Sequence, residues 1–312
     1  MNNFKKYRLL FLENKISKVE FIDFMYNIHQ TLFEYSDEIK NTSISKIEIL
    51  DNKVIMTFRD SGVKLLCIPG DKRIACLDAY NFKSYEEEEL MMQYKLIQDN
   101  DIVIDIGGNY GWYCLHIAKK FPNSKVYTFE PIPNTYNNLQ FNIKLNKIIN
   151  IIPINSGLSD NIGEFTFFCD PNLTVNASLN NVNDNPNAIK IVCNVDVLDN
   201  FVKERGINKV DFIKCDIEGA EIFALKGSIN IIQEQKPKLF VEMLRKWTKK
   251  FHYHPNEIID LLKNIGYGCF KITQGCLLNE VFEINENTIE TNFVFLHKEK
   301  HNSLIFDLQQ LK

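Results

Sequence analysis

Short apolar runs alternate with amphipathic segments along the chain from Asp101 onward. Apolar runs of this length predict buried strands, and apolar positions three and four residues apart predict helices. The predicted strands are 102–106, 125–130, 147–154, 190–195, 210–215, 238–243, 268–272 and 292–298, and the predicted helices are 85–98, 111–121, 134–145, 198–205, 218–226 and 255–263. This alternation predicts an α/β fold, with a doubly wound, mostly parallel sheet covered by helices on both faces.

The first 80 residues follow another pattern. Apolar residues recur at helical spacing over 16–35, which predicts an amphipathic helix. Three short β-like runs follow at 46–50, 53–58 and 63–68, and turn-forming residues between them predict a small meander. We therefore expect an N-terminal extension over 1–80, a main domain over 81–298 and a C-terminal tail over 299–312. The amphipathic helix could be a lid, part of the core or a contact between copies in a homo-oligomer.

Composition narrows the class of protein. The chain has 312 residues, 45% of them hydrophobic, and 36 basic against 40 acidic residues give a net charge of −4. That balance argues against a protein that coats nucleic acid, so no nucleic-acid partner is expected. None of the eight cysteines forms a C-x-x-C pair, so neither a zinc site nor a disulfide framework is indicated. No signal peptide and no membrane-spanning run is recognised, and we expect a cytoplasmic protein.

A glycine-rich turn follows the first strand of the main domain. Residues 105–111 read D-I-G-G-N-Y-G and lead into a helix. Glycines let a ligand approach the backbone, and a helix N-terminus offers free N–H groups. Glu130 ends the second strand, 19 residues beyond Gly111, where a carboxylate can accept both hydroxyls of a ribose.

The spacing of this turn discriminates between ligands. The dinucleotide fingerprint needs glycine at relative positions 1, 3 and 6, and neither Gly107 nor Gly108 starts such a series. The chain contains no Gly-Lys pair, so a phosphate loop is excluded. The pattern D-x-G-x-N-x-G instead fits S-adenosylmethionine binding in doubly wound methyltransferases. Aromatic residues at 110, 112 and 113 could stabilise a sulfonium cation, although simple helix packing explains at least one of them as well.

A second cluster of charges follows the strand 210–215. The segment 214–221 reads K-C-D-I-E-G-A-E and holds three carboxylates within six residues: Asp216, Glu218 and Glu221. Because ligands bind at the carboxyl ends of the strands in such sheets, we expect these acids to face the same opening as Asp105 and Glu130. Favourable interaction with the dipole of a helix N-terminus explains the presence of one acid, but it explains the presence of all three less easily.

At this point the chain resembles a known family. The segments DIGGNYGWY (105–113), TFEPIPNTYNNLQFNIKLN (128–146), LDNF (198–201), VDFIKCDIEGAEIFALKG (210–227) and KPKLFVEML (236–244) are similar, in this order, to the motifs of FkbM-type methyltransferases. The resemblance covers about 85–298. It implies a seven-stranded, Rossmann-like class I domain that uses S-adenosylmethionine and O-methylates a sugar, glycan or polyketide hydroxyl. Gly108 departs from the family pattern, where alanine is commoner, and we expect that difference to cost little.

Site residues follow from these motifs. The candidate catalytic residues are Glu218 as general base, Asp216 as its partner or a metal ligand, and His252 on a loop that could overhang the site, although an ordinary surface loop explains His252 better. The candidate cofactor-binding residues are Asp105, Gly107, Gly108, Asn109, Gly111, Glu130, Pro131, Asn155, Ser156 and Asp216. Asp216, Glu218 and Glu242 are hard oxygen ligands that would suit Mg²⁺, so metal assistance is a further hypothesis.

Other segments and other enzyme classes stay open. The run Glu86–Glu89 fits a solvated charged face, with a ligand contact as the alternative. Acceptor choice is expected to involve the asparagine-rich segment 169–188, the region 245–256 and the N-terminal extension. The partner is expected to be a small-molecule or glycan acceptor. The alternatives are a nucleotide-sugar or dinucleotide enzyme on a similar sheet, and a catalytically inactive S-adenosylmethionine-binding module.

Overall fold

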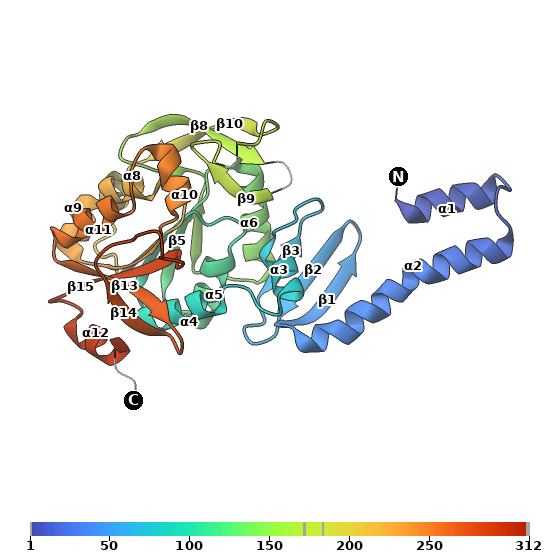
Figure 1. Ribbon diagram of the computed structural model, residues 1–312, viewed down its shortest axis with the longest axis horizontal. Coiled ribbons are helices and arrows are strands. Elements are labelled where there is room, and N and C mark those ends of the chain that lie inside the picture. The colour runs from blue at the N-terminus through green and yellow to red at the C-terminus, as the bar shows by residue number, and fades with distance from the viewer. Residues whose placement is uncertain (1, 171–172, 183, 310–312) are drawn as a thin grey trace.

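The computed structural model describes residues 2–170, 173–182 and 184–309, with the side chains of 173–176 left out. Its centre is an eight-stranded sheet in the order β14-β13-β15-β12-β11-β4-β5-β6 (Figure 1). The five strands from β12 to β6 are parallel, and β15, β13 and β14 add antiparallel pairings. The bounds are β4 (Ile102–Ile106), β5 (Lys125–Phe129), β6 (Ile151–Ile154), β11 (Phe212–Cys215), β12 (Lys238–Glu242), β13 (Tyr267–Thr273), β14 (Leu277–Val281) and β15 (Asn292–His297).

The sheet is mixed, and its strand number corrects an expectation. The family resemblance implies seven strands, whereas the sheet has eight. The additional strand is β14, which pairs only with β13 and forms an antiparallel edge. The five parallel strands are near-continuous apolar runs because helices cover both of their faces.

Two hydrophobic cores lie on opposite faces of this sheet. Val103 of β4 belongs to one core and its neighbour Ile104 to the other, as expected for alternating side chains in a strand. The helices with buried residues in the first core are α3 (Ala75–Asn81), α4 (Glu87–Leu96), α5 (Trp112–Lys120), α6 (Pro133–Leu145) and α12 (Asn302–Gln309). The helices with buried residues in the second are α7 (Leu198–Glu204), α8 (Glu221–Lys226), α9 (Ile229–Gln235) and α11 (Asn256–Lys263).

A second sheet lies above the carboxyl ends of the parallel strands, near the top of Figure 1. Its four strands have the order β7-β10-β8-β9, with bounds β7 (Gly157–Leu158), β8 (Gly163–Asp170), β9 (Leu173–Ser178) and β10 (Ile189–Asp196). The strand predicted over 190–195 is confirmed as β10, but it belongs to this smaller sheet. The asparagine-rich segment 169–188 contributes β9 where the structure describes it, and its residues 171–172 and 183 lie outside the description.

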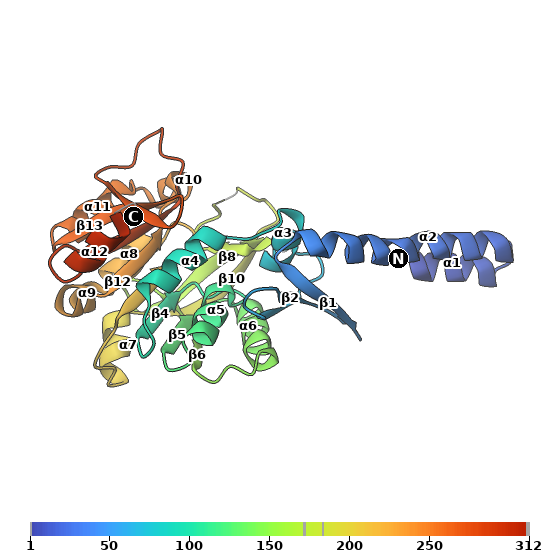
Figure 2. The same ribbon diagram turned by 90° about the horizontal axis from the view of Figure 1, so that it is seen from below.

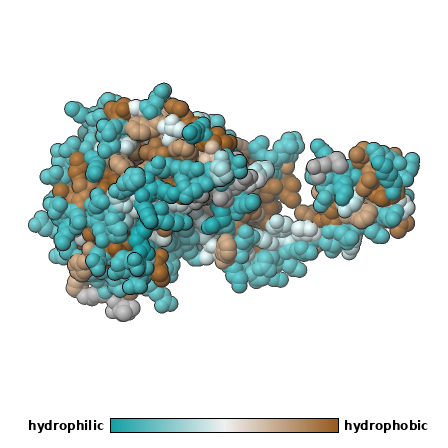
Figure 3. Space-filling view, turned by 45° about the horizontal axis from the view of Figure 1, so that its top comes forward, coloured by the Kyte–Doolittle hydropathy of each residue, from teal (hydrophilic) through white to brown (hydrophobic). Residues whose placement is uncertain are grey.

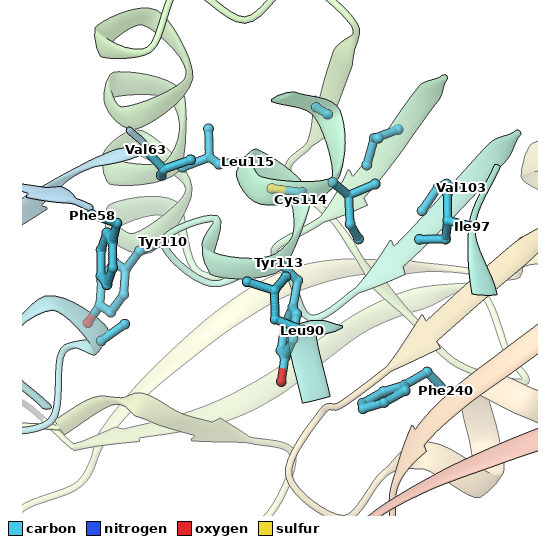
Figure 4. Close-up of a cluster of buried hydrophobic side chains, with 14 of the residues drawn as sticks. Phe58, Val63, Leu90, Ile97, Val103, Tyr110, Tyr113, Cys114, Leu115 and Phe240 are labelled. Carbon is cyan, nitrogen blue, oxygen red and sulfur yellow. The ribbon is translucent and has the colours of Figure 1, made fainter. Parts of the chain in front are cut away.

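The predicted meander is present near the N-terminus. It is a three-stranded sheet of β1 (Ile44–Leu50), β2 (Lys53–Phe58) and β3 (Lys64–Cys67), followed by α3 (Ala75–Asn81). Figure 4 shows that Phe58 of β2 lies in the same cluster as residues of α5 and β12. The core is therefore continuous between this small sheet and the large one, and the domain boundary near residue 80 stays a prediction.

The first two helices form an arm. They are α1 (Asn3–Leu12) and α2 (Lys18–Glu38), and a short 3-10 turn (Ile39–Asn41) leads from α2 into β1. Figures 1 and 2 show both helices extending away from the rest of the molecule. No residue of either helix is buried. Among the residues that the structure describes, no helix is both long enough and apolar enough to cross a membrane.

Candidate active site

A cleft lies at the carboxyl ends of the parallel strands. It is bounded by the turn after β4, the end of β5, the turn after β11 and the end of β12, and the second sheet contributes its apolar side. Because the carboxyl ends of parallel strands meet at one edge of the sheet, side chains from distant segments face one another here. The lining residues on which the site depends are Tyr85, Glu86, Asp105, Gly107, Gly108, Asn109, Tyr113, Glu130, Pro131, Lys214, Asp216, Glu218 and Glu242.

The glycine-rich turn is tightly packed against its neighbours. Gly107 has a left-handed φ of 85°, and a Cβ there would lie 2.0 Å from the carbonyl oxygen of Asp216. The N–H groups of Gly107 and Gly108 both donate to the carbonyl of Phe129, at 3.0 and 2.9 Å. These hydrogen bonds hold the turn after β4 against the end of β5, and the turn after β11 approaches so closely that only glycine fits at position 107.

Gly108 is more constrained than the sequence indicates. A Cβ at this position would lie 2.0 Å from Oγ1 of Thr128 on β5. An alanine there requires this buried threonine to move, so glycine, the departure from the family pattern, suits this position in the present chain. The threonine is not free to rotate, because its hydroxyl donates to Oδ2 of Asp105 at 2.8 Å.

Lys214 is the cation at the centre of the cleft. Its Nζ donates to the carbonyl of Gly107 at 2.9 Å and lies 3.4 Å from Oδ1 of Asp105 and 3.3 Å from Oδ2 of Asp216. The residue is 2% exposed. Burial alone would lower the pKa of Lys214, but the charges of Asp216 and Asp105 outweigh it and raise that pKa, so the ammonium stays charged.

Glu130 is held by the backbone. Its Oε2 accepts from the N–H of Asn109 at 3.0 Å and its Oε1 from the N–H of Ile132 at 2.9 Å. Burial raises the pKa of Glu130 to about 7, although these two N–H groups favour its charged form. Each carboxylate oxygen has a further lone pair for a ligand hydroxyl.

The other end of the cleft is acidic. Glu86, Asp216, Glu218 and Glu242 line it together, and Lys214 is the cation beside them. Burial raises the pKa of Glu86 to about 7, against a hydrogen bond of 2.6 Å that Tyr113 donates to its Oε2. Burial, reinforced by the charge of Asp216, raises the pKa values of Glu218 and Glu242 well above the ordinary value for glutamate. Oε2 of Glu218 and Oε2 of Glu242 are buried without a hydrogen-bond partner among the described residues.

The three acids of the second motif have different roles. Oε1 of Glu221 accepts from the N–H groups of Ile217 and Gly219, both at 3.0 Å, so this carboxylate stabilises the turn. Glu218 lies on the turn itself, with a left-handed φ of 58°, and α8 begins only at Glu221. The predicted start of this helix at 218 is therefore wrong, because residues 216–219 form a loop that directs Glu218 to the cleft.

Comparison with known proteins identifies the family of this site. Residues 105–269, more than half of the chain, match the family model described as the methyltransferase FkbM domain. The chain belongs to the FkbM methyltransferase family. The match begins at Asp105 and includes Glu130, Lys214, Asp216, Glu218 and Glu242, so most of the cleft lies inside the family domain.

Individual relatives cover part of the chain. Methyltransferase sdnD of Sordaria araneosa is 27% identical in an alignment of 159 positions that covers 42% of this chain and 61% of that protein. Hexuronic acid methyltransferase AglP of Haloferax volcanii is 26% identical over 148 residues, 47% of this chain and 58% of that protein. The crystal structure of methyltransferase FkbM from Methylobacillus flagellatus has 16% identity and a TM-score of 0.42, covering 87% of this chain and 60% of that one. The matches span about three-fifths of the length of these proteins.

Two buried polar atoms test whether the cofactor that the FkbM family implies fits here. Oδ1 of Asp105 and Oδ1 of Asn109 are buried without a hydrogen-bond partner among the described residues, although Lys214 lies near the former. Buried polar atoms normally have partners, so both positions suit a donor from a ligand. The residues present therefore fit a cofactor with an ammonium and ribose hydroxyls.

Four of the sequence candidates do not line the cleft of this FkbM-family protein. Asn155 is exposed, and its amide donates to the carbonyls of Glu130 and Pro131 at 2.8 and 3.0 Å. Ser156 donates to the carbonyls of Gly157 and Asn194, while the next residues, Gly157 and Leu158, do line the cleft. His252 is exposed beyond a short 3-10 turn (Lys249–Phe251) that follows α10 (Arg245–Thr248). Gly111 is buried at the start of α5, without lining the cleft.

The proposed magnesium ligands do not form a metal site. Within the described part of the chain, no three His, Cys, Asp or Glu side chains converge in a way that could hold a metal ion. Asp216 is turned to Lys214 and pairs with it at 3.3 Å. We therefore derive no step that depends on a metal.

Sequence reasoning missed the role of two residues. Glu86 belongs to a run of four acids that fits a solvated face, and Glu87 and Glu88 are indeed exposed. Glu86 differs because its left-handed backbone, φ 42°, precedes α4 and its carboxylate receives the Tyr113 hydroxyl. Lys214 had a visible signal: a lysine inside an apolar strand run needs a buried partner.

Proposed function

We propose that this chain is an S-adenosylmethionine-dependent methyltransferase that methylates a hydroxyl group of a neutral sugar, glycan or natural product. The observation that carries the proposal is the division of one cleft between a cofactor half and an acidic half, with Asp105 and Glu130 in the first and Glu218 and Glu242 in the second. Membership of the FkbM family supports the cofactor.

The cofactor half matches the groups of S-adenosylmethionine. Glu130 is held where its free lone pairs can accept ribose hydroxyls, and Asp105 offers a buried oxygen for the ammonium. Phe129, Leu158, Phe167 and Val195 provide apolar surface suited to a flat ring. When bound, S-adenosylmethionine supplies a methyl group on a sulfonium centre.

The acidic half determines what kind of acceptor fits. A hydroxyl can donate to the unpartnered oxygens of Glu218 and Glu242, which removes the cost of leaving them unpaired. An acceptor carboxylate or phosphate would instead meet four acids and one lysine that is already paired. This argument favours a neutral polyhydroxylated acceptor and an O-methylation.

Glu218 is the proposed general base. Its carboxylate, once ionised, would accept the proton of the acceptor hydroxyl as the oxygen–carbon bond forms and the sulfur–methyl bond breaks, with S-adenosylhomocysteine as the leaving group. Such general base catalysis typically contributes about 10²–10⁴-fold. The backbone carbonyl of Glu218 accepts a hydrogen bond of 2.8 Å from Ser178 of β9, which fixes the turn under the second sheet. Alignment of the two reactants by the cleft can supply about 7–11 kcal/mol in favourable cases.

Thermal stabilisation tests the cofactor half. We expect S-adenosylhomocysteine to raise the Tm of the purified chain, and NADH and a nucleotide sugar to leave it unchanged. The matched variants are Asp105→Asn, which should lose the response, and Asp307→Asn on the distal helix α12, which should keep it. Stabilisation by NADH or by the nucleotide sugar alone would replace this proposal with the dinucleotide or nucleotide-sugar alternative.

Methyl transfer tests the acidic half. The chain would be incubated with S-adenosylmethionine carrying a deuterated methyl group and with fractionated neutral and acidic glycans, and products would be read by mass spectrometry. We expect label in a neutral fraction, loss of label with Glu218→Gln, and full label with Glu234→Gln, an exposed residue of α9. Binding of S-adenosylhomocysteine without label in any fraction would favour an inactive binding module.

A further inference from the structure

Two buried cysteines lie in direct contact beside the meander. Cys67 is the last residue of β3, and Cys76 lies in the first turn of α3, nine residues further along the chain. Their Sγ atoms are 3.0 Å apart, and both side chains are buried. Among the described residues, no other two cysteine sulfurs form such a contact. The spacing in sequence matches no recognised cysteine motif, so it is the fold that brings this pair together.

The contact between the thiols is close to the geometry of a covalent bridge. A disulfide has an S–S length of about 2.05 Å, so the two sulfurs need to approach by only about 1 Å. The loop 68–74 that joins them is ordered in the reduced form. In this loop the N–H of Asp71 donates to the carbonyl of Ile68 at 3.2 Å, and the N–H of Arg73 donates to Oδ1 of Asp71 at 3.0 Å. A bridge therefore forms without a rearrangement of the loop.

The two thiols differ in how they can react. Cys76 is fully buried, whereas Cys67 is 9% exposed and lines an open cavity of about 720 Å³ between α2, the meander and the loop after β3. Figure 3 shows hydrophobic side chains at the surface where the arm joins the rest of the molecule. The hydrogen bond between the thiols lowers the pKa of Cys67 and, together with burial, raises the pKa of Cys76. Cys67 is therefore the sulfur that a small oxidant reaches and the one that forms the thiolate.

The loop between the cysteines supports the glycine-rich turn of the cleft. Oδ2 of Asp71 accepts a hydrogen bond from the hydroxyl of Tyr110, a buried residue of that turn. The amide of Asn142 on α6 donates to the carbonyl of Tyr110 at 3.0 Å. The turn is thus held from one side by the loop and from the other by α6. A bridge between Cys67 and Cys76 closes the loop that carries Asp71, so this support can no longer open independently of its surroundings.

We propose that Cys67 and Cys76 are an oxidation site, where hydrogen peroxide converts the two thiols into a reversible disulfide that tethers the loop 68–74. The thiolate of Cys67 attacks one oxygen of the peroxide, the O–O bond breaks, and the hydroxide released takes up the proton lost by Cys67. Sγ of Cys76 then attacks the sulfenic acid formed on Cys67, and a second water leaves with the Cys76 proton. The two thiols lose two electrons and one peroxide is reduced to two waters. A dithiol reverses the bridge by exchange.

Peptide mapping of the full chain tests the oxidation site, and this test does not depend on which molecule the protein methylates. The native chain is treated with hydrogen peroxide, the peroxide is removed with catalase, and free thiols are alkylated with N-ethylmaleimide after denaturation. We expect mass spectrometry to find Cys67 linked to Cys76, and dithiothreitol to restore both thiols. Cys276→Ser is the matched control: Cys276 is less buried than either thiol, and its variant should form the same bridge. Recovery of Cys67 and Cys76 as alkylated thiols, or of Cys67 as a sulfinic acid, would overturn the proposal.

Hydrogen exchange of the wild type in its oxidised and reduced forms tests the tether. We expect the amides of 68–74 to exchange about tenfold more slowly in the oxidised form, because the bridge prevents the loop from opening locally. The Tm of the oxidised form should be about 5 °C higher, since a closed loop removes freedom from the unfolded chain. Peroxide should cause neither change in Cys76→Ser. Equal exchange of 68–74 in the two forms of the wild type would contradict the tether even where the bridge is found.

Discussion

Lys214 donates a hydrogen bond from its ammonium to the carbonyl of Gly107 at 2.9 Å. This bond joins the strand β11 to the glycine-rich turn after β4, and the same ammonium neutralises Asp105 and Asp216. One buried cation therefore supports both halves of the cleft. Its removal leaves two carboxylates without their shared counter-charge.

Lys214→Met is expected to lower the free energy of unfolding by about 3–5 kcal/mol, the usual cost of removing one partner of a buried ion pair. Urea unfolding would measure this loss. Lys298→Met is the matched control, because Lys298 pairs with Glu280 at the surface and its side chain is 57% exposed. We expect the control to lose less than about 1 kcal/mol. Equal losses of unfolding free energy in Lys214→Met and Lys298→Met would contradict the central role of Lys214.

Gly108→Ala is expected to destabilise the protein by about 1–3 kcal/mol, because the new methyl group meets the Thr128 hydroxyl. The double variant with Thr128→Ala should lose less than the sum of the two single variants, since the second change removes the clash. Gly163→Ala should be nearly neutral, because a Cβ there has its nearest neighbour at 3.5 Å. If the losses of unfolding free energy in the two single variants simply add up in the double variant, the new methyl group does not clash with Thr128.

Glu86→Gln is expected to change how stability depends on pH. The folded-state pKa of Glu86 is raised to about 7, above its unfolded value near 4.5, so its contribution is fully present below pH 4.5 and is lost as the pH rises through 7. Relative to the variant, the wild type should lose about 2 kcal/mol of unfolding free energy between pH 4.5 and 8. Chemical denaturation at both pH values would measure the difference. Glu87→Gln is the control, because Glu87 is an exposed neighbour of Glu86. The unfolding free energy of this variant should depend on pH as that of the wild type does.

Turnover is expected to rise with pH above the ordinary titration range of glutamate if Glu218 is the base. Burial raises the pKa of Glu218, so the reactive carboxylate form becomes more populated as the pH increases. Glu218→Gln should lower kcat by about 10²–10⁴-fold and flatten this profile, while the affinity for S-adenosylhomocysteine stays within a few-fold. A profile in Glu218→Gln that keeps the wild-type shape would assign the titration to another group.

The parallel part of the fold is predictable from sequence because its strands are buried on both faces. Runs such as 102–106 and 238–243 are apolar without interruption, and each appears where the pattern predicts it. β8 was missed because only one side of it is buried, and its antiparallel partners include β9, which lies in the asparagine-rich segment. A half-buried strand of this kind is stabilised by pairing and by the packing of one face rather than by a continuous apolar run.

The sequence predicts those site residues that lie at or directly after the carboxyl end of a parallel strand. Asp105, Glu130, Asp216 and Glu218 face one cleft because they follow parallel strands. The position of Glu86 depends on a hydrogen bond to Tyr113, 27 residues away, and no local pattern contains that contact. Asn155 also follows a strand end, but its amide is engaged by backbone carbonyls outside the cleft, so proximity in sequence was misleading there.

The second sheet is formed by one continuous segment of the chain whose two ends lie side by side. Gly157 pairs with Val195 and Leu158 with Asp196. Between those ends, the chain forms a roof that contributes Phe167, Ala177 and Leu179 to the cleft, whereas Asp105, Glu130 and Lys214 lie outside it in the chain. Adjacent ends make a segment exchangeable without disturbing its surroundings. Natural or laboratory recombination that keeps Phe167 and Ser178 could thus exchange the rest of the roof, diversifying which molecules are modified while the residues beneath are inherited unchanged.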